Sequence, residues 1–128
     1  MASAVVRAEV AQELIAAGVD VGTSSVKVAI LRLAGDSQVD TLALRAVRIR
    51  RRDWRKVIQE GYQVALHDAG IAAHDVAYVA STGEGELVEF RRGHFYGMTT
   101  HARGATFLMP SVHAVLDVGA LHARAMRN

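Results

Sequence analysis

The sequence predicts an α/β fold in which helices cover a mixed β-sheet. Two observations support this prediction. Three apolar segments separated by short turns come early in the chain, and a strongly amphipathic helical pattern then alternates with further strand patterns. The chain has 128 residues, of which 51% are hydrophobic, so it is long enough to form a domain with its own core.

Apolar runs interrupted by polar residues predict the first part of the sheet. We expect strands over residues 17–21, 25–33 and about 39–49, with a Gly-, Asp- and Ser-rich turn before the third. Lys27 alternates with apolar residues in the second strand, so Lys27 faces one side of the sheet and its apolar neighbours the other. About three residues separate the first two strands, which predicts an antiparallel hairpin.

An amphipathic helix is predicted next. Asp53 is a suitable N-cap, and Gly70 is suitable for the left-handed position after the last turn. The apolar stripe consists of Trp54, Val57, Ile58, Gly61, Tyr62, Ala65 and Leu66.

Strands and helices alternate in the rest of the chain. In order, we expect a fully buried strand over 76–82, a short helix from "GEGELVEF", a strand over 94–99, a helix over 100–109 that ends at Pro110, a buried strand over 112–119 and the start of another strand at "LHARAM".

One short pattern occurs twice. The sequence "GVDVG" (18–22) returns as "LDVG" (116–119), each time at the end of a predicted buried strand and before a turn into a second strand. Turns of this kind present backbone N–H groups to a phosphate, and glycine lets its oxygens approach closely. Two such turns in one chain predict phosphate binding between two lobes.

The residues around the repeat supply matching chemistry. The hydroxyls of Thr23, Ser24 and Ser25 add donors, while Lys27 adds a compact positive charge. Asp20 and Asp117 would repel a phosphate, so we expect them to act through a Mg²⁺ ion and its waters. For one such unit alone, a polar turn without a ligand is an equally good interpretation.

These residues resemble a known group of proteins. "DVGTSSVK" followed by "DVGA" looks like the paired phosphate motifs of the superfamily of actin, sugar kinases and heat-shock chaperone ATPases. Within it, residues 16–128 resemble the ATPase subunits of ATP-dependent benzoyl-CoA reductase, which are related to the activators of 2-hydroxyacyl-CoA dehydratases. The segments that carry this likeness are "AGVDVGTSSVKVAIL", "YVASTGEGE", "GHFYGMTTHARGA" and "AVLDVGALHARAMRN". Of these, "TGEGE" and "TTHARGA" favour the reductase subunits.

The resemblance implies the ribonuclease H-like first lobe of an actin-like ATPase fold. Asp20 and Asp117 would be the catalytic residues and would hold Mg²⁺ through water. The residues that match the ATP-binding positions are Gly22, Thr23, Ser24, Ser25, Lys27 and Gly119. Where the superfamily often has a second glycine and then a polar or acidic residue, this chain has Ala120, Leu121 and His122.

The resemblance also implies a reaction. ATP hydrolysis would drive a conformational change in a dimer of ATPase subunits, and a bridging [4Fe–4S] cluster would pass a low-potential electron to catalytic reductase subunits, which reduce the aromatic ring of benzoyl-CoA. The chain has no cysteine, so the cluster is expected only in the full-length dimer.

We expect three regions along the chain. Residues 1–15 form an N-terminal extension, for which the spacing of Val6, Val10 and Leu14 predicts a short helix. The first ATPase lobe spans 16–110. The second lobe starts at 111 and is truncated after its first hairpin, at 128.

Three other functions remain open at this point. The chain resembles activators of 2-hydroxyacyl-CoA dehydratases as well. A small-molecule kinase of the same superfamily would need a catalytic acid in the first lobe, for which Glu84 is the nearest candidate. A truncated lobe without catalytic function is the third.

Some polar residues have two interpretations. Glu84 and Glu86 lie either near the nucleotide or a subunit contact, or are simply acids favoured in a first helical turn. The basic run "RIRRRDWRK" (48–56) is better explained by solvent exposure than by nucleic acid. His101 and Arg103 are candidates for a structural hydrogen-bond network.

Composition limits the remaining partners. A net charge of +2 is too small to predict nucleic-acid binding. No apolar run approaches the ~20 residues that cross a bilayer, and the first residues do not resemble a secretory signal. We therefore expect a cytoplasmic protein that binds neither nucleic acid nor membrane.

Overall fold

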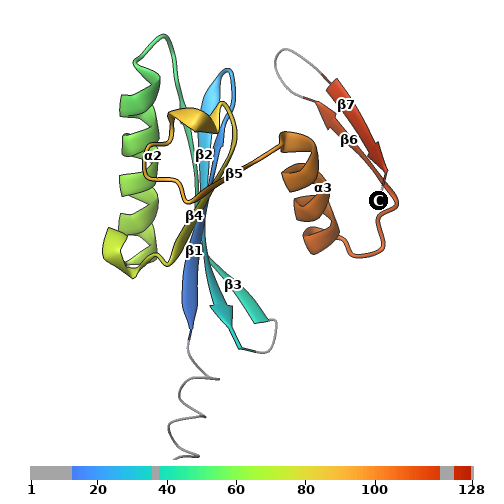
Figure 1. Ribbon diagram of the computed structural model, residues 1–128, viewed down its shortest axis with the longest axis horizontal. Coiled ribbons are helices and arrows are strands. Elements are labelled where there is room, and N and C mark those ends of the chain that lie inside the picture. Colours follow the sequence, from blue (N-terminus) through green and yellow to red (C-terminus); the bar gives the residue numbers. More distant parts are fainter. Residues whose placement is uncertain (1–12, 36–37, 119–122, 128) are drawn as a thin grey trace, which may run out of the picture.

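A five-stranded mixed sheet with one helix on each side is the centre of the molecule. The computed structural model describes residues 13–35, 38–118 and 123–127. The strand order is β3-β2-β1-β4-β5, and a separate two-stranded hairpin follows (Figure 1). No helix in these described ranges is long and apolar enough to cross a membrane.

Strands β1 (Leu14–Val21), β2 (Ser25–Ala34) and β3 (Gln38–Arg48) form an antiparallel meander, as the sequence predicts. In β1, Val19 and Val21 are buried, whereas Asp20 points to the opposite face. Leu14 begins β1, so the helix predicted from the Val6–Val10–Leu14 spacing is wrong at Leu14; Val6 and Val10 lie outside the described residues. Leu14 instead pairs with Leu33 of β2, so its backbone is part of the sheet.

Helix α2 (Trp54–Ala69) covers one face of the sheet, and its predicted ends are confirmed. The Asp53 side chain accepts a hydrogen bond from the Arg55 N–H, and Gly70 adopts φ 70° after the last turn. Gly61 faces the sheet, where an added Cβ would make an ordinary contact at 3.5 Å with the Val28 side chain. The buried residues of the helix are Val57, Ile58, Gly61, Tyr62, Ala65 and Leu66, as predicted.

Strand β4 (Tyr78–Gly83) runs parallel to β1 and to β5 (Gly93–Phe95). Two 3₁₀ turns flank β4, η1 (Ala73–Asp75) and η2 (Gly85–Leu87). The prediction that this strand is fully buried is wrong at its start, since Tyr78 is 41% exposed. The short β5 pairs only with residues 80–82, so no described strand pairs with Tyr78 on that side.

The last elements are helix α3 (Gly97–Leu108) and the hairpin of β6 (Ala114–Val118) and β7 (Ala123–Arg127). The strand predicted over 94–99 ends at Phe95, and α3 begins at Gly97, three residues before the predicted start. The helix ends before Pro110, as expected. Within α3 no residue is buried.

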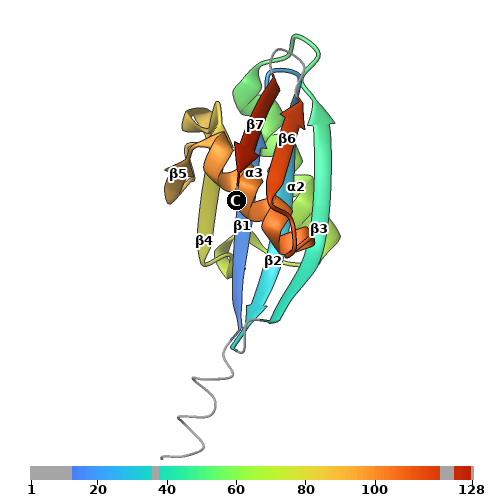
Figure 2. The same ribbon diagram turned by 90° about the vertical axis from the view of Figure 1, so that its right-hand side faces the viewer.

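The prediction of a buried strand over 112–119 is also wrong. Among the described residues β6 pairs with β7 alone, and Leu116 is 71% exposed. Both hairpin strands and α3 lie on the side of the sheet opposite α2 (Figures 1 and 2). The proposed division of the chain at residues 15 and 110 remains a prediction.

Candidate functional site

The β1–β2 turn contains the first glycine motif. The Gly22 N–H donates to the Ser25 carbonyl over 2.9 Å, so this amide closes the turn. The Ser24 carbonyl accepts from the Ile49 N–H at 2.9 Å, which ties the turn to the end of β3. Thr23 and Ser24 are exposed, and in the described part of the chain neither hydroxyl has a protein partner. Their hydroxyls and N–H groups are thus the donors that the turn offers.

Asp20 lies between two other elements. Its Oδ2 is 3.3 Å from Nε2 of His101, on α3. On its other side is Gly83, where an added Cβ would come 3.0 Å from Oδ1. The residue after the buried Thr82 therefore has to be small, and its φ of +68° also favours glycine. Asp20 is held at the end of β1, with its carboxylate on the sheet face opposite α2.

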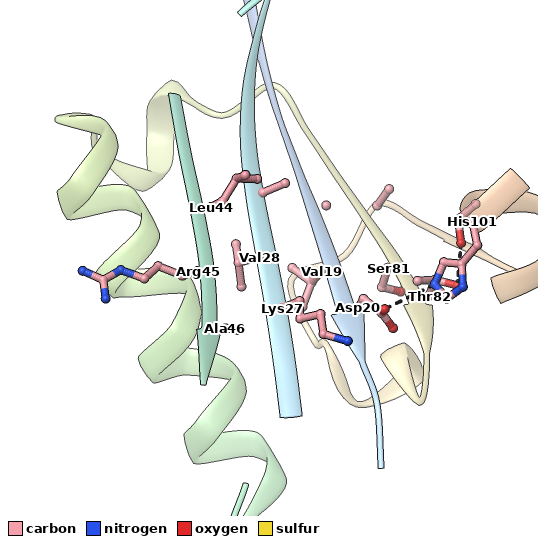
Figure 3. A pocket seen from close by; sticks show the side chains of 14 residues that line it. Val19, Asp20, Lys27, Val28, Leu44, Arg45, Ala46, Ser81, Thr82 and His101 are labelled. Carbon is pink, nitrogen blue, oxygen red and sulfur yellow. Dashed lines mark hydrogen bonds and ion pairs between the residues drawn. The ribbon is translucent and has the colours of Figure 1, made fainter. Parts of the chain in front are cut away.

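Asp20 and Lys27 line the same pocket. They are directly opposite each other on β1 and β2, and their side chains project from one sheet face. The pocket has a volume of about 530 Å³, which is within the usual range for small-molecule sites. Figure 3 shows Asp20 directed towards His101, with Lys27 beside it. Lys27 is exposed and forms no ion pair with any residue that the structure describes.

Small residues form the floor of this pocket. Gly18, Ala29, Ala46 and Ala80 occupy the same sheet face as Asp20 and Lys27. The opposite wall comes from α3, through Thr100 and His101. The site is therefore a smooth apolar surface with one carboxylate and one ammonium group at its polar end.

A network of hydroxyls joins α3 to β4. The Thr82 Oγ1 donates to the Phe95 carbonyl at 2.7 Å. The Thr100 Oγ1 lies 3.3 Å from Thr82 Oγ1 and 3.1 Å from the Gly97 carbonyl, and its one proton can go to either. No sequence pattern predicted Thr82, Gly83 or Thr100 in the site, and His101 was predicted only as part of a structural hydrogen-bond network. The quoted "STGEGE" and "TTHARG" segments contain all four, but nothing in their spacing indicates that they converge on Asp20.

The second hairpin repeats the backbone pattern of the first. Asp20 is opposite Lys27, and Asp117 is opposite Arg124; in both cases the next pair closes a connection of four residues. Strands β1 and β6 run in the same direction in both views (Figure 2). Gly119 and the side chain of Asp117 lie outside what the structure describes, so their predicted roles remain predictions.

The donor set fits a magnesium nucleotide better than a metal held by protein alone. Among the described residues, no three His, Cys, Asp or Glu side chains gather around one point. Mg²⁺ is commonly held by one or two carboxylates together with phosphate oxygens and waters, and Asp20 can supply one such carboxylate. A [4Fe–4S] cluster does not fit this chain, because it contains no cysteine.

Other candidates lie away from the pocket. Glu84 and Glu86 are exposed, beside and within η2, and do not line it. In the basic run, Arg52 pairs with Glu60 and Arg55 with Glu89, while Trp54 packs against the core. These contacts agree with the interpretation of a solvated surface.

Comparison with known proteins defines the class. The chain matches the BadF/BadG/BcrA/BcrD ATPase family over residues 17–128, and it belongs to this family. The fold also agrees: component A of (R)-2-hydroxyglutaryl-CoA dehydratase from Acidaminococcus fermentans superposes with a TM-score of 0.80 at 25% identity, over 89% of this chain and 42% of that one. The chain therefore has the α/β fold of the actin-like type, in a member of an ATPase family.

Two curated relatives place the chain more narrowly. It is 55% identical over 114 residues to one of the subunits of benzoyl-CoA reductase from Thauera aromatica, and 28% identical over 111 residues to the activator of lactoyl-CoA dehydratase from Anaerotignum propionicum. These matches cover 89% and 86% of this chain but 40% of each relative. The chain thus spans less than half the length of either relative, and is a homologue of the Thauera reductase subunit over the part that it covers.

Proposed function

We propose that this chain forms one wall of a Mg-ATP site in an ATPase subunit of benzoyl-CoA reductase. The observation that carries the proposal is the convergence of Asp20 and Lys27 on one pocket, at the first of two Asp-x-Gly hairpins of the same register, in a member of an ATPase family.

At the site, each residue has a role that follows from its chemistry. The ammonium group of Lys27 would bind phosphate oxygens, which a compact cation suits. The hydroxyls of Thr23 and Ser24, which have no protein partner within the described residues, would donate to the phosphates, with Ser25 and Gly22 shaping the turn. Asp20 would hold a water of the Mg²⁺ ion, and the ion would supply charge neutralisation for phosphoryl transfer.

The second hairpin would complete the site. Asp117 and Gly119 are assigned here from the repeated register and the repeated sequence, and Asp117 would face the same ion from the other side. Support comes from the common direction of β1 and β6 on the sheet side opposite α2. Two carboxylates acting through water would keep Mg²⁺ exchangeable with the nucleotide, as turnover requires.

For the whole protein, we propose that ATP hydrolysis is coupled to electron transfer for reduction of the aromatic ring of benzoyl-CoA. The support is the 55% identity to a benzoyl-CoA reductase subunit, against 28% to a dehydratase activator. The partners would be a second ATPase subunit and catalytic reductase subunits, in the cytoplasm. Since the residues present do not fit an iron–sulfur cluster, none of them is given a role in electron transfer.

An activator of a 2-hydroxyacyl-CoA dehydratase is the second candidate. The structural agreement with the Acidaminococcus component favours it, although the two groups share this fold. The genes beside this one distinguish the candidates, because they encode reductase subunits in one case and dehydratase subunits in the other.

Hydrogen exchange in the protein at its native length tests the site. We expect Mg-ATP to protect residues 20–27, and Asp20→Asn to lose most of that protection, because it lacks the charge that attracts the metal. Asp40→Asn changes an exposed carboxylate on β3 of the same sheet and should leave the protection intact. A wild-type protein whose 20–27 segment exchanges equally with and without Mg-ATP would rule out the assignment.

A further inference from the structure

The contact between His101 and Asp20 joins the proposed metal site to a helix. The two atoms, Nε2 and Oδ2, are 3.3 Å apart, and the residues are 81 positions apart in the chain. A carboxylate oxygen can only accept a hydrogen bond, so Nε2 of His101 is the donor. Both side chains are about one-third exposed or less, at 32% and 27%, so solvent reaches the contact only in part.

This contact leaves a defined part of Asp20 available. Oδ2 is occupied by His101, while Oδ1 lies beside the backbone of Gly83. The hydrogen bond from His101 therefore restrains the carboxylate, because rotation about the Cβ–Cγ bond would break it. A carboxylate that acts on a metal-bound water has to be held in one orientation.

Helix α3 is placed by the same contact. Thr100, next to His101, has its Oγ1 3.3 Å from Oγ1 of Thr82, the β4 residue directly opposite Asp20, and 3.1 Å from the Gly97 carbonyl, so its one proton has two competing acceptors. Two consecutive residues of α3 therefore lie against two adjacent strands at one level of the sheet. None of the residues of α3 is buried, so the hydrogen bond of His101 is an important part of what holds this end of the helix against the sheet.

We propose that His101 is a positioning residue, which orients the carboxylate of Asp20 for the water shell of the magnesium ion and fixes α3 to the site. This role rests on the proposed Mg-ATP function. His101 touches neither nucleotide nor metal; it acts through Asp20, as an outer-sphere partner acts on a ligating side chain.

Two variants of nearly equal side-chain volume test the proposal. His101→Met removes the donor, whereas His101→Gln keeps an N–H at similar reach. In the protein at its native length, ADP affinity is measured with magnesium and with EDTA. We expect His101→Met to lose about ten-fold or more of the magnesium-dependent affinity, in the range typical of outer-sphere partners. Affinity in EDTA should be unchanged, and His101→Gln should restore most of the loss.

A second measurement needs no nucleotide. Hydrogen exchange of the α3 amides, residues 100–108, should rise in His101→Met and stay near wild type in His101→Gln. His113→Ala is the control, because this exposed histidine lies between α3 and β6. The side chains of the two test variants are similar in size. A folding defect caused by the change in side-chain volume alone would therefore lower the thermal unfolding temperature of both.

The outcomes separate the two proposals. If wild-type protein gains no ADP affinity from magnesium, the proposed function is wrong and the role of His101 falls with it. If the wild-type gain is present but His101→Met retains it, only the positioning role is overturned. An equal loss of affinity with magnesium and with EDTA would likewise overturn it, since a merely structural defect would weaken both.

Discussion

At the scale of single residues, Gly83 is the position where the backbone leaves least freedom. It has φ +68°, and an added Cβ would lie 2.4 Å from the Val21 carbonyl oxygen and 3.0 Å from Oδ1 of Asp20. We expect Gly83→Ala to destabilise the protein by at least about 1–2 kcal/mol, the cost of left-handed backbone for a residue with a Cβ. Equilibrium unfolding in urea measures this.

Gly104→Ala is the matched control. Gly104 lies within α3, nothing is within 4 Å of its added Cβ, and alanine favours helix by up to ~1 kcal/mol. The two Gly→Ala changes should therefore differ in sign. Equal effects would show that strain at Gly83 is absent or relieved by movement of β4.

The same residues mark how far sequence could predict the site. Asp20 and Lys27 were found because hairpin pairing follows from local spacing, and opposite residues share a face. The contact of His101 with Asp20 depends on where α3 lies relative to the sheet, and no local pattern encodes that position. The use of the Gly22 N–H inside its own turn is likewise not encoded in a local pattern, since turn geometry decides which amides remain available.

At the scale of elements, an ion pair joins α2 to β3. The hydrogen bond from Arg45 holds the pKa of Asp68 below its ordinary value. The folded-state pKa is thus lower than that of the unfolded chain, near 3.9, so the pair contributes stability above this pH and loses it as the pH falls through the folded value. Arg45→Gln should therefore be less stable than wild type at pH 7, with a difference that shrinks towards zero in acid.

Urea unfolding at pH 7 and at successively lower pH checks this. The difference at neutral pH should be small, because both side chains are solvated. Arg48→Gln changes an exposed arginine on the same strand that forms no ion pair within the described residues, and its difference from wild type should not vary with pH. A difference for Arg45→Gln that persists in acid would mean that Arg45 acts by packing instead.

Elements with a strong local pattern were predicted well, and those that depend on neighbours were not. Helix α2 has both caps and an apolar stripe, and its bounds and buried face agree with the prediction. The strand expected over 94–99 ends at Phe95 because the backbone turns into α3 at Gly97, where the composition suits strand and helix alike. The strand expected to be buried at 112–119 has the apolar residues of a core strand, but within the described residues only β7 pairs with it.

At the scale of the whole molecule, apolar burial is divided unevenly. The core lies between α2 and the five-stranded sheet, where Val19, Val26 and Ile58 are at most 1% exposed. The α3–hairpin part instead exposes large apolar side chains, among them Phe107, Leu108 and Leu116. We therefore expect α2 and the five-stranded sheet to unfold as one cooperative unit. Amides of α3, β6 and β7 should exchange with solvent through local openings that cost less free energy.

Two substitutions test this division by size of effect. Ile58→Ala removes a side chain that is 1% exposed and should cost about 2–5 kcal/mol in the free energy of unfolding. Leu108→Ala removes a side chain that is 81% exposed. It should change the free energy of unfolding by no more than about 0.5 kcal/mol, as surface substitutions usually do. Urea unfolding followed by far-UV circular dichroism measures both. A cost for Leu108→Ala that approaches that of Ile58→Ala would mean that α3 shares one cooperative core with the sheet, because only buried contacts in that core could lose so much free energy on truncation.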